Sequence, residues 1–414
     1  MKKLVYSIFG TLLLLHFTSV SFAQIDFAEV TGVVVDKKSD KPIPACNVYV
    51  RNRDIGTVAN SKGEFSIKIP LEYIDRNLVF SIIGYQAVEV PITQLSQEEN
   101  KISLAQSVIV MDEVVVRDAE DIIREALNRV NDNYPTNPEL LTTFYREIIK
   151  KNNSYVDISQ GILDVFKLPY QKAGTDRIKI NKGFRSKDYK PQDTLAFKLR
   201  GGPNTMLLLD MVKNPALVLS HDILPFYVYE LTDIREFDSK RHYEISFEPR
   251  KGGDMDMELY HGKIFVEQNT LAISELRFGY SPQAVKIAGK YLVKDKPRLA
   301  KLTPLLVEYE VKYREFKGRW YLYYVKNELA MRCNWKKRLF NSTFHSTSEM
   351  VVTDRNMMSP QPFDRKQTTK SYVVFSEEAS KYDDDSFWEN YTIIKPEDDI
   401  RKALSKINAR TSKK

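Results

Sequence analysis

The chain has 414 residues and a formal net charge of +7, with 43% hydrophobic and 11% aromatic residues. This length exceeds the roughly 100 to 200 residues of one domain, so we expect two or more domains with sizeable cores. Lysines and arginines alternate with acidic residues along the chain instead of gathering in one basic stripe. The composition therefore argues against a nucleic-acid-binding protein, and we expect no nucleic-acid partner.

Residues 1–23 have the pattern of a secretory signal peptide. Lys2 and Lys3 precede an apolar run from Leu4 to Phe17, and Ala23 completes a small-residue cleavage site. The apolar run is shorter than the roughly 20 residues that a membrane-spanning helix needs, which favours a cleaved signal over an anchor. Removal of the two lysines leaves a charge of 7 − 2 = +5. We expect an exported protein in the periplasm or at the periplasmic face of the outer membrane.

Residues 24–117 predict a small all-β domain, because short apolar runs alternate with clusters of Gly, Pro, Asn and Asp. The segment GTVANSKGEF, residues 56 to 65, predicts a hairpin whose turn uses a positive φ at Gly63. After this turn, Phe65, Ile67 and Ile69 lie on one face of a half-buried strand. We interpret the domain as a β-sandwich.

Several turn and core positions of this domain also occur together in a known family. They are Gly32, Val34, Asp36, Pro42, Ile43, Pro44, Ala45, Gly56, Thr57, Gly63, Glu64, Phe65, Ser81, Ile82, Gly84 and Tyr85. With them the segment resembles the carboxypeptidase-regulatory-like domain, a transthyretin-like β-sandwich on exported proteins of Gram-negative bacteria. The resemblance implies an accessory module and no peptidase activity. Nearly the whole mature chain resembles exported proteins that are characterised only by this domain, which implies an architecture and not an activity.

Residues 118–138 predict a connecting helix, because Ile122, Ile123, Ala126 and Leu127 recur at helical spacing. From 139 to 357 the chain returns to long alternating strands with tight turns, which predicts a curved antiparallel sheet with a few packed helices. The strand YEVKYREF alternates tyrosine and valine with charged residues, as a strand with one buried and one solvent-facing side does. The segment 263 to 273, a strand, a polar turn and a returning strand, is similar to hairpins of lipoprotein carriers, which are curved half-barrels with a helix on an apolar concave face.

Residues 358–414 predict a docking segment followed by a terminal helix. Pro396 suits the first helical position, and the acidic residues that follow it suit the positive end of the helix dipole. Ile400, Ala403, Leu404 and Ile407 then form one apolar stripe. The fold class is therefore mainly β with some helix (α+β).

The segment 203 to 219 predicts a helix packed on the large sheet. Its apolar residues Leu207, Leu208, Met211 and Val212 are candidate ligand-binding residues, either as part of a lid over a lipid or as an ordinary core helix. Gly201 and Gly202 precede it and are candidates because backbone amides at a helix start can bind an anion. The lysine and the spacing of a P-loop are absent from this stretch.

Catalytic motifs are absent from the sequence. The histidines at 221, 242, 261 and 345 lack a glutamate three residues later, HExxH does not occur, and no G-x-S-x-G elbow is present. We therefore expect neither a catalytic site nor a metal or other cofactor. Cys46 and Cys333 are interpreted as buried free thiols, with a single disulfide as the alternative.

Together these patterns favour a non-enzymatic envelope binding protein. The sandwich is expected to dock other envelope or outer-membrane proteins, and the larger domain to bind a lipid or another apolar, envelope-derived ligand. One alternative is a purely structural scaffold that contacts other envelope proteins. Another is an enzyme whose site is invisible in the sequence.

Overall fold

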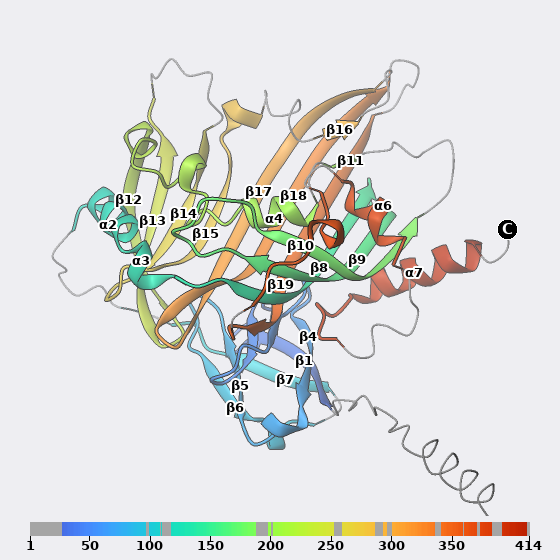
Figure 1. Ribbon diagram of the computed structural model, residues 1–414, viewed down its shortest axis with the longest axis horizontal. Helices are drawn as coiled ribbons and strands as arrows, with labels where there is room; N and C mark the ends of the chain where they lie inside the picture. The colour runs from blue at the N-terminus through green and yellow to red at the C-terminus, as the bar shows by residue number, and fades with distance from the viewer. Residues whose placement is uncertain are drawn as a thin grey trace, which may run out of the picture.

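The computed structural model describes residues 27–96, 99–107, 109, 117–187, 198–199, 202–251, 259–285, 293–295, 300–335, 341–358, 360–370, 373–382 and 391–411. The predicted signal peptide at 1–23 lies outside these residues. Figure 1 shows the arrangement of the rest: a small β-sandwich lies beneath a large curved sheet, and helices lie at the edges and inside the curve. This architecture confirms the predicted fold class, whereas the exact domain boundaries stay predictions.

Two facing sheets form the sandwich. The first has the order β4-β1-β7 and the second the order β3-β2-β5-β6. Short 3-10 turns at Leu71–Tyr73 and Ile92–Gln94 connect some of the strands. The strands are β1 Phe27–Asp36, β2 Asn47–Val50, β3 Gly56–Val58, β4 Glu64–Pro70, β5 Asn77–Ser81, β6 Val88–Pro91 and β7 Glu99–Leu104. The inner faces bury an apolar core that includes Phe65, Ile67 and Ile69, as the alternation in the sequence predicts.

The segment 56 to 65 is not a hairpin, so that prediction is wrong. Gly63 has the expected positive φ of 72°, and Asn60 N donates to Glu64 O at 2.8 Å. Beyond this turn, however, β3 pairs with β2 while β4 pairs with β1. The turn thus carries the chain from one sheet of the sandwich to the other, because each strand gains more burial by closing the core than by extending a two-stranded ribbon.

A helical segment connects the sandwich to the large sheet. Helix α2 runs over Ala119–Asn128, and α3 follows at Val130–Asn133. The Asp118 carboxylate caps α2 by accepting from Glu120 N at 2.8 Å. Ile122 and Ile123 are fully buried, which confirms the predicted apolar face.

The large sheet has ten antiparallel strands in the order β10-β9-β8-β19-β18-β17-β15-β14-β13-β12. A separate two-stranded ribbon joins β11 Lys198–Leu199 to β16 Val293–Asp295. Several of the large strands exceed ten residues and carry bulges, which bend and twist the sheet. Their bounds are β8 Glu139–Lys151, β9 Ser154–Lys167, β10 Arg177–Lys187, β12 Tyr227–Phe237, β13 Lys240–Pro249, β14 Tyr260–Glu267, β15 Ile273–Tyr280, β17 Ala300–Phe316, β18 Arg319–Trp335 and β19 Ser342–Asn356.

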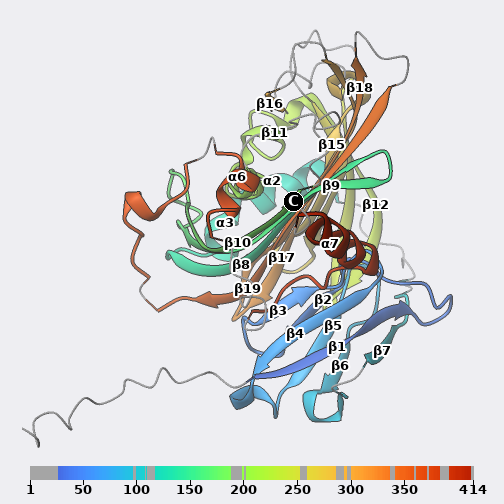
Figure 2. The same ribbon diagram turned by 90° about the vertical axis from the view of Figure 1, so that its right-hand side faces the viewer.

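The inner side of the curve is filled by the segment after Gly202 and by helix α6, Phe375–Ala379 (Figure 2). Helix α4 covers only Pro203–Leu208, so the predicted helix over 203 to 219 is too long. The chain then continues through irregular turns and two 3-10 turns, Pro215–Leu217 and Leu224–Phe226. Asp210 explains the early end, because its buried carboxylate bonds to side chains of the sheet instead of facing solvent.

A buried polar network holds this segment against the sheet. The Asp210 carboxylate is fully buried and accepts hydrogen bonds from Tyr313 at 2.6 Å, from Tyr170 at 2.9 Å and from the Lys167 ammonium at 2.6 Å. The Lys167 ammonium also lies 3.5 Å from Asp176. Such a network stabilises one arrangement of the segment, because removing any member leaves a buried group unpaired.

The sandwich packs against the outer side of the curve. Tyr313 of β17 points inward to Asp210, whereas its neighbour Arg314 points to the sandwich and pairs with Asp54 at 2.9 Å. Arg355 of β19 reaches the same Asp54 oxygen at 2.9 Å, and Tyr323 donates to the Thr57 carbonyl at 2.6 Å. The charged side of the YEVKYREF strand is therefore largely covered, which corrects the expectation that it faces solvent.

The carboxyl-terminal segment contacts both the sandwich and the large sheet. Ser61 of the sandwich donates to the Glu397 carboxylate at 2.9 Å, and Glu397 also lies 3.6 Å from the buried Arg146 of β8. Helix α7, Asp398–Thr411, then places Ile400 against Ile148 and Ile158. The predicted terminal helix is thus confirmed, but it begins at Asp398, so Pro396 is not its first helical residue. A short 3-10 turn at Arg365–Gln367 lies earlier in the segment.

Candidate ligand-binding cleft

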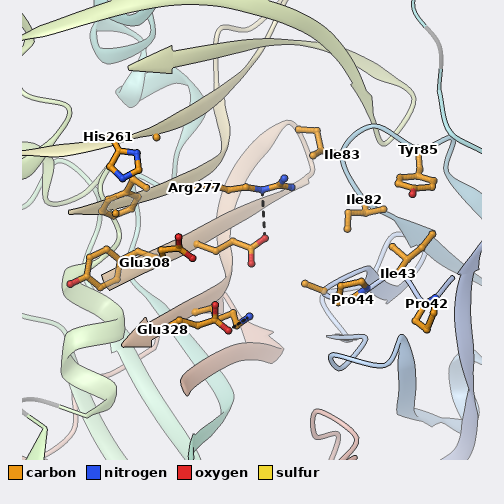
Figure 3. A pocket seen from close by; sticks show the side chains of 17 residues that line it. Pro42, Ile43, Pro44, Ile82, Ile83, Tyr85, His261, Arg277, Glu308 and Glu328 are labelled. Atoms are coloured by element: carbon orange, nitrogen blue, oxygen red, sulfur yellow. Dashed lines mark ion pairs between the residues drawn. The ribbon is translucent and has the colours of Figure 1, made fainter. Parts of the chain in front are cut away.

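A cavity of about 590 Å³ opens between the sandwich and the outer side of the large sheet. Its size lies in the range of about 300 to 1,000 Å³ that is usual for ligand pockets. Figure 3 shows sandwich side chains along one wall and charged sheet side chains along the other. We call this cavity the interface cleft.

The sandwich wall is apolar. It consists of the turn before β2, with Pro42, Ile43 and Pro44, and of the segment after β5, with Ile82 and Ile83. Pro42 and Pro44 are exposed even though the surrounding chain packs closely. The exposed prolines on either side of the buried Ile43, together with the half-buried Ile82, form a rigid apolar surface whose ordering on binding costs little entropy.

The sheet wall is charged and follows the register of three strands. Arg277 of β15 lies opposite Glu310 of β17, and Glu310 lies opposite Lys326 of β18. Arg277 Nε lies 3.8 Å from the Glu310 carboxylate. Burial raises the pKa of Glu310, but the attraction of Lys312 and Arg277 outweighs it and holds that pKa below the usual value. Glu310 is therefore ionised near neutral pH and is neutralised by Lys312 and Arg277.

The next row of the same wall is different. Glu308 of β17 lies directly opposite Glu328 of β18, which places two carboxylates side by side. Glu328 pairs with Lys326 at 2.8 Å, whereas no cation in the described part of the chain pairs with Glu308. Like charges directly opposite each other destabilise a sheet. Of the three lining carboxylates, Glu310 pairs with Lys312 at 3.1 Å and Glu328 pairs with Lys326. The exposed Glu308 is therefore the negative charge that favours a positively charged group in the cleft.

The polar groups of the lining are carboxylates, cations, tyrosines and one histidine. It contains no serine, threonine or cysteine that could act as a nucleophile, and His261 is its one histidine. Within the described ranges, no three His, Cys, Asp or Glu side chains are grouped as metal ligands. The arrangement is suited to bind an amphipathic ligand through one apolar and one acidic wall.

The residues singled out from the sequence lie elsewhere. Leu207, Met211 and Val212 are buried in the core inside the curve, and Leu208 is 58% exposed. Gly202 has a φ of 45° and packs against Phe375, while Gly201 lies outside the described residues. The structure brings Leu207, Met211 and Val212 into one core cluster but not into the interface cleft. Their role in ligand binding stays a prediction.

The cleft residues could not be selected from the sequence. The sequence offers two weak indications of the cleft. One is the alternation of acidic residues through Glu308 and Glu310, and the other is the pair Pro42 and Pro44. These two signals are more than 260 residues apart in the chain, and nothing local shows that they face each other. The free, buried state of Cys46 and Cys333 was expected and is found.

The fold and the cleft define a β-rich protein with a small sandwich docked on a large curved sheet. The model of the CarboxypepD_reg-like domain family matches residues 30–116. The chain therefore contains such a domain, as the turn residues of the sandwich predict. This match indicates no catalytic family, and the comparison with curated proteins finds no relative.

Three solved structures are similar over part of the chain. A DUF1329 family protein from Desulfovibrio piger has 12% identity and a TM-score of 0.25, with 60% of this chain and 99% of that chain covered. Lipovitellin has 6% identity and a TM-score of 0.28, with 57% and 27% covered. A putative membrane-associated protein from Bacteroides fragilis has 9% identity and a TM-score of 0.16, with 80% and 98% covered. TM-scores below 0.5 do not establish a common fold. Among the described helices, none has the length and apolar character needed to cross a membrane.

Proposed function

We propose that this is a non-enzymatic binding protein of the cell envelope, and that its interface cleft binds an amphipathic, positively charged segment of another envelope protein. The observation that supports this most is the Glu308 and Glu328 pair, which faces an apolar wall of prolines and isoleucines. A lysine or arginine between the two carboxylates would relieve their repulsion, and an adjacent apolar side chain would contact Pro44 and Ile82.

The location in the envelope rests on the signal-peptide pattern of residues 1–23 and on the resemblance of the sandwich to modules of exported proteins. The absence of a nucleophile from the cleft lining favours binding over catalysis. The lipid that the sequence suggested as a ligand is the main alternative occupant, because the apolar wall alone would also suit an acyl chain.

Photo-cross-linking in the native host tests this function. A photo-reactive amino acid at Pro44, which is exposed in the cleft, should capture a discrete partner protein, whereas the same group at the exposed Lys366 outside the lining should not. The double variant Glu308→Gln/Glu328→Gln should lose most of the adduct. Glu248→Gln, an exposed carboxylate outside the cleft, is the matched control and should keep it.

Mass spectrometry of the adduct and of an organic extract separates the candidate ligands. A protein adduct that depends on the two glutamates supports the proposal. A stoichiometric lipid in the extract, without a protein adduct, would favour a lipid carrier. Equal labelling from Pro44 and Lys366 would refute a role for the cleft.

A further inference from the structure

A second cavity, of about 260 Å³, lies at another part of the junction between the sandwich and the large sheet. Three tight turns converge on it: the turn after β2, the turn between β12 and β13, and the turn between β17 and β18. None of its lining residues lines the interface cleft. We call it the turn pocket.

The turn pocket is basic. Its lining includes five cationic side chains, Arg51, Arg53, Lys240, Arg314 and Lys317, and two acidic ones, Asp238 and Glu315. The net charge of the lining is therefore 5 − 2 = +3. Glu89 and Asp54, which lie outside the lining, offset the charges of Arg51 and Arg314, so the excess that can attract an anion is 3 − 2 = +1.

Several of these charges already have partners within the protein. Arg51 pairs with Glu89 at 2.7 Å, and Lys240 pairs with Glu315. Asp238 accepts a hydrogen bond from Tyr49 at 2.8 Å.

Arg53 and Lys317 pair with no carboxylate in the described part of the chain. Arg53 lies over the ring of Tyr73 at 4.5 Å, and the exposed Lys317 lies over the ring of Phe316 at 5.0 Å. These two side chains can therefore turn toward a ligand without breaking an ion pair.

Arg314 supplies an independent observation. Its side chain is 3% exposed, and its guanidinium lies over the rings of Tyr49 and Tyr323, 4.6 and 5.0 Å from their centroids. Nη2 donates to Asp54 and to the Arg53 carbonyl, but Nε and Nη1 have no hydrogen-bond partner among the described residues. Asp54 compensates the charge of Arg314, but its two donors without a hydrogen-bond partner carry a desolvation cost that an oxyanion in the pocket would reduce.

We propose that the turn pocket binds a phosphate group, held by Arg53 and Lys317 at its rim and by the field of the buried Arg314. The volume suits one tetrahedral oxyanion and its immediate substituent. The shared chemistry is a phosphate monoester or diester, which a lipid headgroup or a free phosphate compound can supply. This inference is independent of the ligand in the interface cleft.

Calorimetric titration of the purified protein with inorganic phosphate at low ionic strength tests the site. The double variant Arg53→Gln/Lys317→Gln should weaken the apparent phosphate affinity about tenfold or more, since each charged hydrogen bond contributes substantially to binding. The control Lys37→Gln/Lys41→Gln removes the same charge from exposed positions outside the pocket and should leave the affinity unchanged. Sodium chloride at matched ionic strength should produce no saturable heat.

Co-sedimentation with vesicles identifies the source of the phosphate. Binding to phosphatidylglycerol vesicles that free phosphate displaces, and that the pocket variant loses, assigns a headgroup. Saturable phosphate binding without vesicle binding assigns a soluble compound. No saturable phosphate binding, or the same affinity in the pocket variant and the control, would overturn the proposal. The single variant Lys317→Gln serves as a second test, because this exposed turn residue makes no ion pair that holds the fold within the described residues.

Discussion

A buried carboxylate in the large sheet makes the stability of this protein depend on pH. Glu147 of β8 is 5% exposed and accepts a hydrogen bond from Tyr145 at 3.0 Å. Burial, and then the nearby charge of Asp157, raise the pKa of Glu147 from 4.5 to about 7. A tenfold change in proton affinity equals about 1.36 kcal/mol, so this rise corresponds to at most about 3.4 kcal/mol.

The sign of the effect follows from the raised value. Below pH 4.5 the Glu147 carboxyl is protonated in both the folded and the unfolded chain, so the difference between its two pKa values does not reduce the free energy of unfolding. Between pH 4.5 and 7 the unfolded chain ionises while the folded chain stays protonated, so the free energy of unfolding falls as the pH rises. Above pH 7 the loss is complete.

Glu147→Gln removes this titration and keeps an acceptor for Tyr145. Relative to the wild type, the variant should gain about 2.5 kcal/mol of unfolding free energy between pH 5 and pH 8. Urea unfolding at both pH values, followed by the fluorescence of tryptophans such as the buried Trp320, measures this difference. Glu248→Gln, at an exposed position, should show no such gain. Parallel pH profiles for the wild type and Glu147→Gln would refute the reasoning.

Three further predictions concern other parts of the fold. Asp54→Ala should lower the free energy of unfolding by about 3 to 5 kcal/mol, because two buried arginines lose their shared partner; a loss under about 1 kcal/mol in urea unfolding would contradict this. Gly63→Ala should lower the free energy of unfolding more than Gly318→Ala, which should lower it by only about 1 to 2 kcal/mol. Both glycines have positive φ, but a Cβ at Gly63 would lie 2.5 Å from a carbonyl oxygen, whereas the space at Gly318 is open. Equal losses of stability would exclude the steric contribution at Gly63. Cys46 and Cys333 should resist alkylation in the native protein and react fully in urea, since both are buried and burial raises the pKa of Cys46 to about 12. Alkylation of the native protein at about pH 8, measured by intact mass, would contradict this.

Local sequence patterns were sufficient to predict an element wherever its buried residues repeat with the period of a strand or a helix. The alternation through Phe65, Ile67 and Ile69 predicted a half-buried strand, and the stripe that begins at Ile400 predicted the terminal helix. The turn residues of the sandwich were sufficient to predict its domain family, because tight turns restrict φ and therefore the residue types that can occupy them.

Tertiary packing decided what the local patterns left open. The turn at Gly63 is compatible with a hairpin, but the closing of the sandwich core sends β3 and β4 into different sheets. The apolar segment from Leu207 to Val212 reads as one helix, but the bonds of Asp210 to the sheet end the helix early. In both cases contacts distant in sequence outweigh a small local preference.

The sequence by itself determined the two β-rich parts, the helices that join and end them, and the family of the first part. Only the tertiary structure decided that the sandwich covers the charged side of β17 at Lys312 and Arg314, and leaves the interface cleft and the turn pocket beside it. The physical reason is that the sequence of a strand shows which of its faces is polar, but not whether water or another domain covers that face.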